Sequence, residues 1–172
     1  MQLFADGRQM VTAALLTALA IALNIFEAAF SPVLILPGIK LGLANIVIII
    51  SLYIFPVRVT FLVLTMRVIL SGLLMGTFFS AAFLIGGTGA LVSFGVMLAA
   101  KRLEGVSSLG VSILGAAAHN IGQIVTASLL INNYALFYYL PLAIILSVPI
   151  GFVTGFVARV GINTLQKTKP EL

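Results

Sequence analysis

Six long apolar runs, separated by short stretches of charged residues, proline, glycine or asparagine, limit what this chain can fold into. Apolar residues make up 62% of the sequence and charged residues 8%, with a mean hydropathy of +1.26. A soluble domain needs a far more charged surface, and each helical crossing of a bilayer takes about 20 apolar residues. The chain of 172 residues is therefore predicted to be an all-α, multi-pass protein of the cell membrane.

The runs predict six transmembrane helices that pack as one compact bundle, a single integral membrane domain covering residues 1–172. The expected helices lie near residues 9–28, 41–55, 57–76, 81–100, 109–131 and 140–165. The second run is shorter than a usual membrane span, and Pro149 is expected to kink the last helix. The first run is expected to be a membrane helix and not a cleaved signal peptide, because it is long enough to span and five more runs follow it.

Basic residues mark alternate ends of the predicted helices and set the expected orientation. Loops on the cytoplasmic side of membrane proteins are enriched in lysine and arginine. With the N-terminus inside, the outer ends hold only Lys40, and the cytoplasmic ends hold Arg8, Arg58, Lys101, Arg102, Arg159, Lys167 and Lys169. Both termini are therefore predicted to face the cytoplasm. Basic residues scattered in this way form no stripe of the kind that binds nucleic acid.

Polar residues gather in the outer half of the predicted bundle. His119, the single histidine of the chain, is followed by Asn120 and Gln123 within the fifth apolar run. A helical rise of about 1.5 Å per residue places Arg67 near the bilayer centre, at a depth similar to that of His119. The same half holds Glu27, Lys40 and Asn45. Polar groups at membrane depth are costly to bury, so we interpret these seven residues as a candidate substrate-binding site.

Structural interpretations of these residues stay open beside the functional one. Asn, Gln and His side chains often tie membrane helices together, at about 1 kcal/mol per hydrogen bond. A guanidinium near the midplane costs at least about 3 kcal/mol and needs a partner or water. Glu27 is a candidate for that partner, which would make a purely structural ion pair with Arg67. In a binding site, Arg67 and Lys40 would instead neutralise an anionic group of the ligand.

Small residues at intervals of four mark surfaces where helices approach closely in lipid. Glycine pairs of this kind lie on the third and last predicted helices, at Gly72 and Gly76 and at Gly151 and Gly155. We expect these pairs to pack inside the bundle. Ala14, Ala18 and Ala22 form a similar stripe on the first helix, and this stripe is equally suited to docking a separate membrane subunit.

The sequence holds few residues with which to perform catalysis. Asp6 is the sole aspartate, and the chain has no cysteine, so neither an Asp-rich magnesium–diphosphate site nor a zinc or di-metal centre is expected. The sequence also lacks the nucleophile elbow of serine hydrolases and the phosphate-binding loop of ATPases. We therefore predict a protein that is not an enzyme and uses no metal or cofactor.

Two segments, Pro37–Asn45 and Ala118–Gln123, together with Arg67, resemble the Gx transporter family, often labelled heptaprenyl diphosphate synthase component I. That family is similar to the substrate-binding S components of energy-coupling-factor importers, and the resemblance covers essentially the whole chain. It implies a six-helix protein that captures a vitamin or cofactor precursor under the loop between its first two helices. The implied partners are a transmembrane coupling subunit, which would dock on Ala14, Ala18 and Ala22, and two cytoplasmic ATPases.

Two other functions stay open at this point. The chain is also interpretable as a non-catalytic membrane subunit associated with isoprenoid or quinone synthesis, or as a homodimeric exporter. The importer predicts association with ATPases, the second function predicts association with a soluble synthase, and the third predicts transport without a partner.

Overall fold

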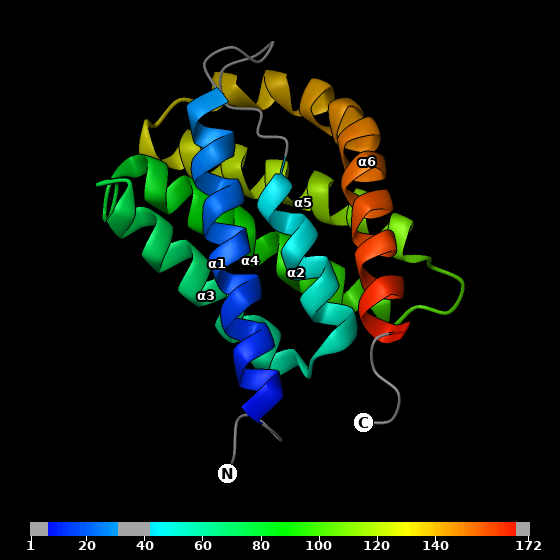
Figure 1. Ribbon diagram of the computed structural model, residues 1–172. Coiled ribbons are helices and arrows are strands. Elements are labelled where there is room, and N and C mark those ends of the chain that lie inside the picture. Colours follow the sequence, from blue (N-terminus) through cyan, green and yellow to red (C-terminus); the bar gives the residue numbers. More distant parts are fainter. Residues whose placement is uncertain (1–6, 31–41, 168–172) are drawn as a thin grey trace.

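A computed structural model of the chain describes residues 7–30 and 42–167, and all regular structure within these residues is helical (Figure 1). The helices in chain order are α1 (Gly7–Phe30), α2 (Leu43–Ile54), α3 (Val57–Leu74), α4 (Ala81–Lys101), α5 (Ser108–Leu130), the short 3-10 helix η2 (Tyr134–Tyr139) and α6 (Leu140–Lys167). The predicted all-α fold is thus confirmed. The short helix η2 lies where the sequence predicts a loop.

Five helical segments are long and apolar enough to cross a membrane: α1, α3, α4, α5 and the segment formed by η2 and α6. This result indicates a multi-pass membrane protein. The sixth helix, α2, has 12 residues and is about 18 Å long at 1.5 Å per residue, less than the hydrocarbon thickness of about 30 Å. Length and composition therefore support five membrane spans. That α2 also crosses the membrane stays a prediction.

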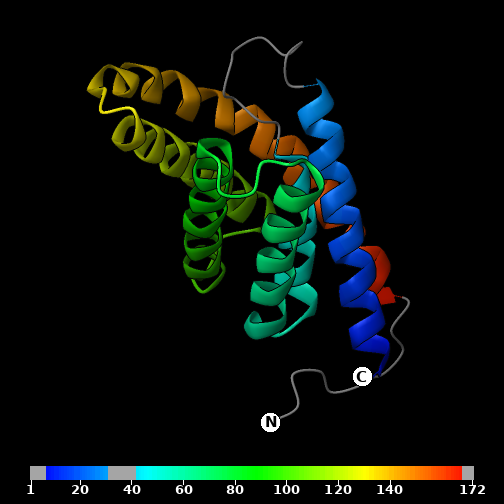
Figure 2. The ribbon, with the colours of Figure 1, turned by 90° about the vertical axis from the view of Figure 1, so that its left-hand side faces the viewer.

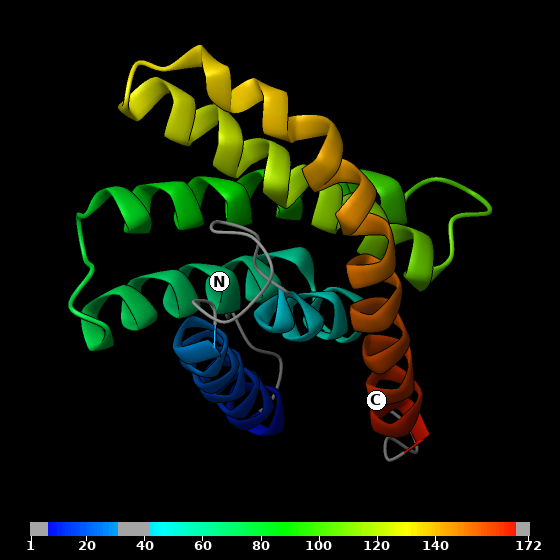
Figure 3. The same ribbon diagram turned by 90° about the horizontal axis from the view of Figure 1, so that it is seen from above.

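The helices form two groups that meet at α2. Helix α5 packs between α4 and α6, and α1 packs against α2 and α3 (Figures 2 and 3). Helix α2 contacts each of the other five α-helices. Helix α6 contains Pro149 and bends along its length, as Figure 3 shows. The expected kink is present because proline removes a backbone hydrogen bond from the helix interior.

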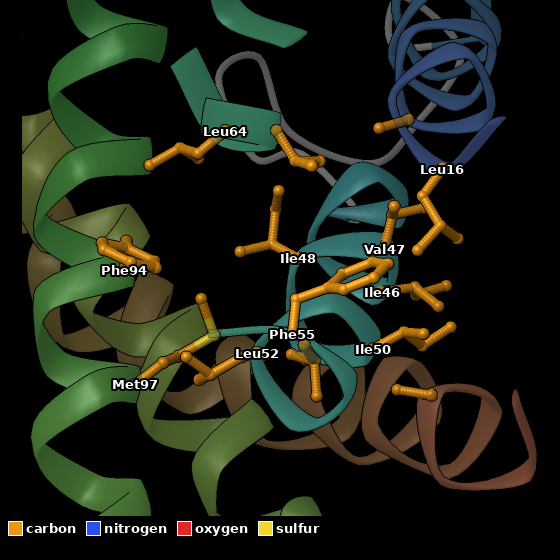
Figure 4. Packing of buried hydrophobic residues seen from close by; sticks show 14 of the residues in the cluster. Leu16, Ile46, Val47, Ile48, Ile50, Leu52, Phe55, Leu64, Phe94 and Met97 are labelled. Carbon is orange, nitrogen blue, oxygen red and sulfur yellow. The ribbon is translucent and has the colours of Figure 1, made fainter. Parts of the chain in front are cut away.

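The hydrophobic core is centred on α2. Residues 44–52 of this helix are all buried, as expected for a helix that is apolar on every side. The apolar side chains that Figure 4 labels on α2 point in several directions, and Leu16 of α1, Leu64 of α3 and Met97 of α4 belong to the same core cluster. Isoleucine, valine and leucine supply most of this core. Because α2 is surrounded, little of its surface faces lipid.

Charged side chains from neighbouring helices complete the two ends of α2. The Glu27 carboxylate of α1 accepts the backbone N–H groups of Gly42 and Leu43, at 2.6 and 3.2 Å. At the other end, Lys101 of α4 donates to the backbone oxygen of Leu52 at 2.6 Å. The first N–H and last C=O groups of a helix have no partner within the helix, and lipid offers none. These two contacts therefore allow α2 to begin and end inside the bundle.

Glycines permit the closest helix approaches. A Cβ at Gly151 of α6 would lie 2.6 Å from the Ile113 Cα of α5, and a Cβ at Gly155 would lie 2.7 Å from the Ser112 Cβ. The expectation that this pair packs inside the bundle is therefore confirmed. Gly76 is different, because it ends the turn after α3 with φ +66° and has nothing within 4 Å of its Cβ position. Its role is backbone conformation, since residues with a side chain rarely adopt positive φ.

The two ends of the bundle differ in charge. Helix α1 begins and α6 ends at the same end, which we call the terminal end (Figure 1). The first turn of α3 and the last turn of α4 also lie there, so Arg8, Arg58, Lys101, Arg102 and Lys167 gather at the terminal end. The opposite end, called the distal end, holds the last turn of α1 and the start of α2. That the terminal end faces the cytoplasm stays a prediction.

Candidate functional site

A cavity of about 110 Å³ lies near the distal end, between the two groups of helices. Helices α1 to α5 all contribute to its wall. The polar residues that line it are Asn24, Glu27, Asn45, Arg67, Ser71, Thr77 and His119. Four of the residues predicted for the binding site, from four different helices, therefore share one cavity: Glu27, Asn45, Arg67 and His119. Their separation in the sequence shows that the fold, and not a local motif, brings them together.

Arg67 is the buried cation of this cavity. Its side chain is 5% exposed, and its Nη1 donates to the Asn45 Oδ1 across a distance of 3.4 Å. That distance is beyond the usual range for N–H···O hydrogen bonds, so the contact is weak. Arg67 also interacts electrostatically with Glu27. A guanidinium has five N–H donors, and Asn45 takes up only one of them.

Glu27 has a structural role in addition to its place in the cavity wall. It is 3% exposed and accepts the backbone N–H groups of Gly42 and Leu43. Gly42 adopts a left-handed conformation with φ 71° and supplies no side-chain cap of its own. The carboxylate thus caps α2 from another helix and complements the positive end of its dipole. It is more than a counter-ion for Arg67.

His119 reaches the cavity because α4 and α5 approach closely. A Cβ at Gly89 of α4 would lie 3.0 Å from the His119 backbone oxygen and 3.2 Å from its ring atom Cε1. A Cβ at Gly122 of α5 would lie 3.0 Å from the Gly89 Cα. The absence of side chains at these two glycines lets the helices meet, and the histidine ring then lies at the wall of the cavity.

Asn120 and Gln123 lie near the cavity but are not among its lining residues. Asn120 Nδ2 donates to the Ala143 backbone oxygen at 3.3 Å and to Ser147 Oγ at 2.9 Å, which ties α5 to α6. The Gln123 Cγ lies 2.7 Å from the Cβ position of Gly89, so this residue faces α4. Its Oε1 is buried and has no hydrogen-bond partner among the described residues. A direct ligand contact by either residue stays a prediction.

Lys40, the remaining predicted binding residue, lies outside the described residues. The cavity wall also includes residues that were not predicted from the sequence, among them Ser71 and Phe83. Ser71 stands one helical turn after Arg67, and its buried hydroxyl has no hydrogen-bond partner among the described residues. Phe83 of α4 packs against α3, where a Cβ at Gly72 would lie 2.7 Å from its ring. The spacing of Ser71 from Arg67, four residues, was the available signal.

A second hollow lies on the outside of the bundle, between α1 and α3. It has a volume of about 350 Å³ and is lined almost entirely by apolar residues, including Ala14, Ala18, Met66 and Leu70. Ala14, Ala18 and Ala22 are all exposed. The predicted alanine stripe therefore faces away from the interior of the bundle, and two of its three members line the hollow.

A family model described as heptaprenyl diphosphate synthase component I matches residues 16–160. The chain belongs to this family. The matched region contains α2 to α5 in full and every described residue of the cavity wall. No curated protein and no solved structure gives a significant match. The heptaprenyl diphosphate synthase component I family also carries the Gx transporter label, so the resemblance seen in the sequence is confirmed at the level of the family.

The cavity of this family member is suited to binding a small polar molecule. It combines one buried cation, one buried carboxylate, amide and hydroxyl groups, and the apolar surfaces of Val68, Met75 and Phe83. Sites for small molecules have this composition, with few polar groups in a mostly apolar wall. Among the described residues, no three His, Cys, Asp or Glu side chains gather as they would to hold a metal ion.

Proposed function

We propose that the chain is the substrate-binding membrane subunit of an importer of the energy-coupling-factor type, and that it is not itself an enzyme. In this role it captures a small vitamin or cofactor precursor from the outer face of the membrane. The observation that carries the proposal is the cavity near the distal end, where buried Arg67 and Glu27 meet Asn45, Ser71 and His119. Ionisable groups at membrane depth mark ligand or ion sites by default.

The positions of the basic residues support capture from outside. They gather at the terminal end, which by the positive-inside rule faces the cytoplasm. The cavity lies toward the opposite end, beside Glu27 in the last turns of α1 and Gly42 at the start of α2. A ligand from the outer side therefore has the shorter path to Arg67.

The outer face of α1 supports docking of a second membrane protein. Ala14, Ala18 and Ala22 are exposed, and an apolar hollow runs beside the first two. Small residues allow another helix to approach closely in lipid. A transmembrane coupling subunit docked there would connect the chain to two cytoplasmic ATPases. The energy for uptake would come from these partners, because the sequence contains no phosphate-binding loop of its own.

Affinity purification of the full chain from its native membrane tests this proposal. We expect a membrane coupling subunit and two ATPases to co-purify, and Ala18→Leu to reduce their recovery by at least ten-fold. Ala99→Leu is the matched control, because Ala99 is also an exposed alanine but lies on α4. Equal recovery with Ala18→Leu and Ala99→Leu would contradict docking at the stripe. Co-purification of a soluble prenyl synthase without ATPases would contradict the importer function. It would support a role as a membrane subunit associated with isoprenoid synthesis.

A further inference from the structure

The guanidinium of Arg67 has donors that its described neighbours do not use. Its one hydrogen bond within the described residues is the long contact of 3.4 Å with Asn45. The side chain is nevertheless almost fully buried. A buried charge is stable only when hydrogen bonds and countercharge compensate for lost water. The unused N–H groups of Arg67 can therefore donate to a ligand group that carries hydrogen-bond acceptors and no donors.

Ser71 offers a second donor close by. It follows Arg67 by four residues, which places both side chains on one face of α3, and both line the cavity. The Ser71 hydroxyl has no partner among the described residues. A hydroxyl and a guanidinium one helical turn apart together match an acceptor with two oxygens, because each oxygen can take a donor of its own.

The size and charge of the cavity restrict that acceptor. An engineered cavity of about 150 Å³ holds benzene, which has six carbon atoms, so the volume of about 110 Å³ found here accommodates a smaller group. Arg67 is the sole lining residue among those described with a permanent positive charge, and Glu27 lies in the same wall. The Glu27 charge is partly compensated by the two N–H groups that the carboxylate accepts at the start of α2, and it opposes more than one further negative charge beside Arg67. A doubly charged phosphate would find no second cation among the described lining residues, so a singly charged acid is the better match.

We infer that the cavity is a carboxylate-binding site, in which Arg67 and Ser71 hold the acid group of a compact organic monoacid. The inference rests on the proposed function, since it names the chemical class of the captured substrate. Arg67 binds the carboxylate through the donors that Asn45 leaves unused. Ser71 donates to the second oxygen, and Val68 and Phe83 contact the carbon atoms next to the acid.

Binding of propionate to the full chain in nanodiscs of zwitterionic lipid, measured at pH 7, tests this inference. Propionamide has the same number of non-hydrogen atoms and no charge, so it is the matched probe. Ligand-observed saturation-transfer NMR gives the affinities, and empty nanodiscs correct for partition into lipid. We expect saturable binding of propionate and at least ten-fold weaker binding of propionamide. In protein with labelled arginine, the Arg67 side-chain nitrogen resonance is expected to shift with propionate alone.

Two arginines of α3 provide the variant and its control. Arg67→Gln is expected to weaken propionate binding at least ten-fold, whereas Arg58→Gln, at the exposed start of the same helix, is expected to change it less than two-fold. Should Arg67→Gln fail to fold, Arg67→Lys keeps the charge and loses the planar donor pair, and a loss of similar size is expected. Ser71→Ala is expected to weaken propionate binding about three- to ten-fold.

Three results would overturn the carboxylate site. They are equal affinity for propionate and propionamide, an Arg67 resonance that does not respond to saturating propionate, and tighter binding of methylphosphonate than of propionate. The importer is tested separately, because it depends on partners. Propionate binding without co-purified ATPases would support the carboxylate site and contradict the importer. Co-purified ATPases without propionate binding would support the importer and contradict the carboxylate site.

Discussion

The Glu27 carboxylate on α1 accepts the backbone N–H of Gly42 at 2.6 Å, and so caps a helix to which it does not belong. The two residues are joined by a segment of 14 residues. Gly42 contributes the left-handed backbone that turns the chain into α2, and Glu27 contributes the acceptor that the helix start requires. The same carboxylate interacts electrostatically with Arg67. One side chain therefore stabilises both the start of α2 and the charge of the cavity.

Replacing Glu27 is expected to destabilise the whole bundle. Glu27→Ala removes the cap of α2 and leaves the buried Arg67 without its nearby carboxylate, which together cost about 3 kcal/mol in the free energy of unfolding. Glu27→Gln keeps an acceptor and should cost less. Unfolding in mixed detergent measures both effects. Glu104→Ala is the control, since Glu104 is exposed, and a Glu27→Ala loss no larger than that of Glu104→Ala would contradict the capping role.

Lys101 is expected to stabilise the opposite end of α2. It donates to the Leu52 oxygen and lies 4.9 Å from the centre of the Tyr53 ring. Lys101→Met keeps the length of the side chain but loses both contacts, at a cost of about 1 kcal/mol because the lysine is partly exposed. The neighbouring exposed Arg102 serves as control, and Arg102→Met should change the unfolding free energy by less than about 0.5 kcal/mol. Equal effects at the two positions would refute a specific contact with α2.

Two glycine-to-alanine substitutions are expected to act in opposite directions. At Gly151, a new Cβ would lie 2.6 Å from the Ile113 Cα, and backbone cannot move aside without separating α5 from α6. Gly151→Ala should therefore cost about 2 kcal/mol. At Gly95 of α4, nothing lies within 4 Å, so Gly95→Ala should raise stability by about 0.5 kcal/mol through helix propensity. Thermal unfolding of the two variants checks the sign of each change.

Asn120 and Arg67 are expected to separate stability from binding. Asn120→Ala removes hydrogen bonds to Ala143 and Ser147, and should lower stability by about 1 kcal/mol with propionate affinity within two-fold of the unmodified chain. Arg67→Gln should instead lower propionate affinity at least ten-fold, an effect larger than its effect on stability. Parallel unfolding and binding measurements make the comparison. A ten-fold loss of affinity in Asn120→Ala would instead assign Asn120 to the ligand site, as the sequence pattern predicts.

The ends of the six α-helices could be predicted from the sequence to within two residues. The expected segment 57–76 corresponds to α3 at Val57–Leu74, and 109–131 corresponds to α5 at Ser108–Leu130. The helix boundaries coincide with residues that have strong local effects on the backbone. Pro56 precedes α3, and Ser107 caps α5 by accepting the Gly110 N–H. Local chemistry of this kind needs no knowledge of the fold.

The wall of the cavity was only partly predictable, because periodicity gives the depth of a residue better than its direction. His119 and Asn120 are neighbours in the sequence and lie at nearly the same depth, yet one lines the cavity and the other bonds to α6. Adjacent residues of a helix point about 100° apart, and the position of α6 decides which direction meets which neighbour. Ser71 was missed because its one signal in the sequence, the spacing of four residues from Arg67, points to a site only once Arg67 is known to line a cavity.

The enclosure of α2 also bears on how the protein fits its surroundings. Membranes differ in thickness, and a lipid-facing helix that is too short or too long must tilt or deform the bilayer. Helix α2 is buried from Ala44 to Leu52, and Glu27 and Lys101 bind its two ends. Because protein surrounds this helix, its length does not have to match the thickness of the bilayer. Hydrophobic mismatch then acts on the five segments that are long enough to cross a membrane, and the part of the cavity wall that α2 supplies is held in place by the neighbouring helices.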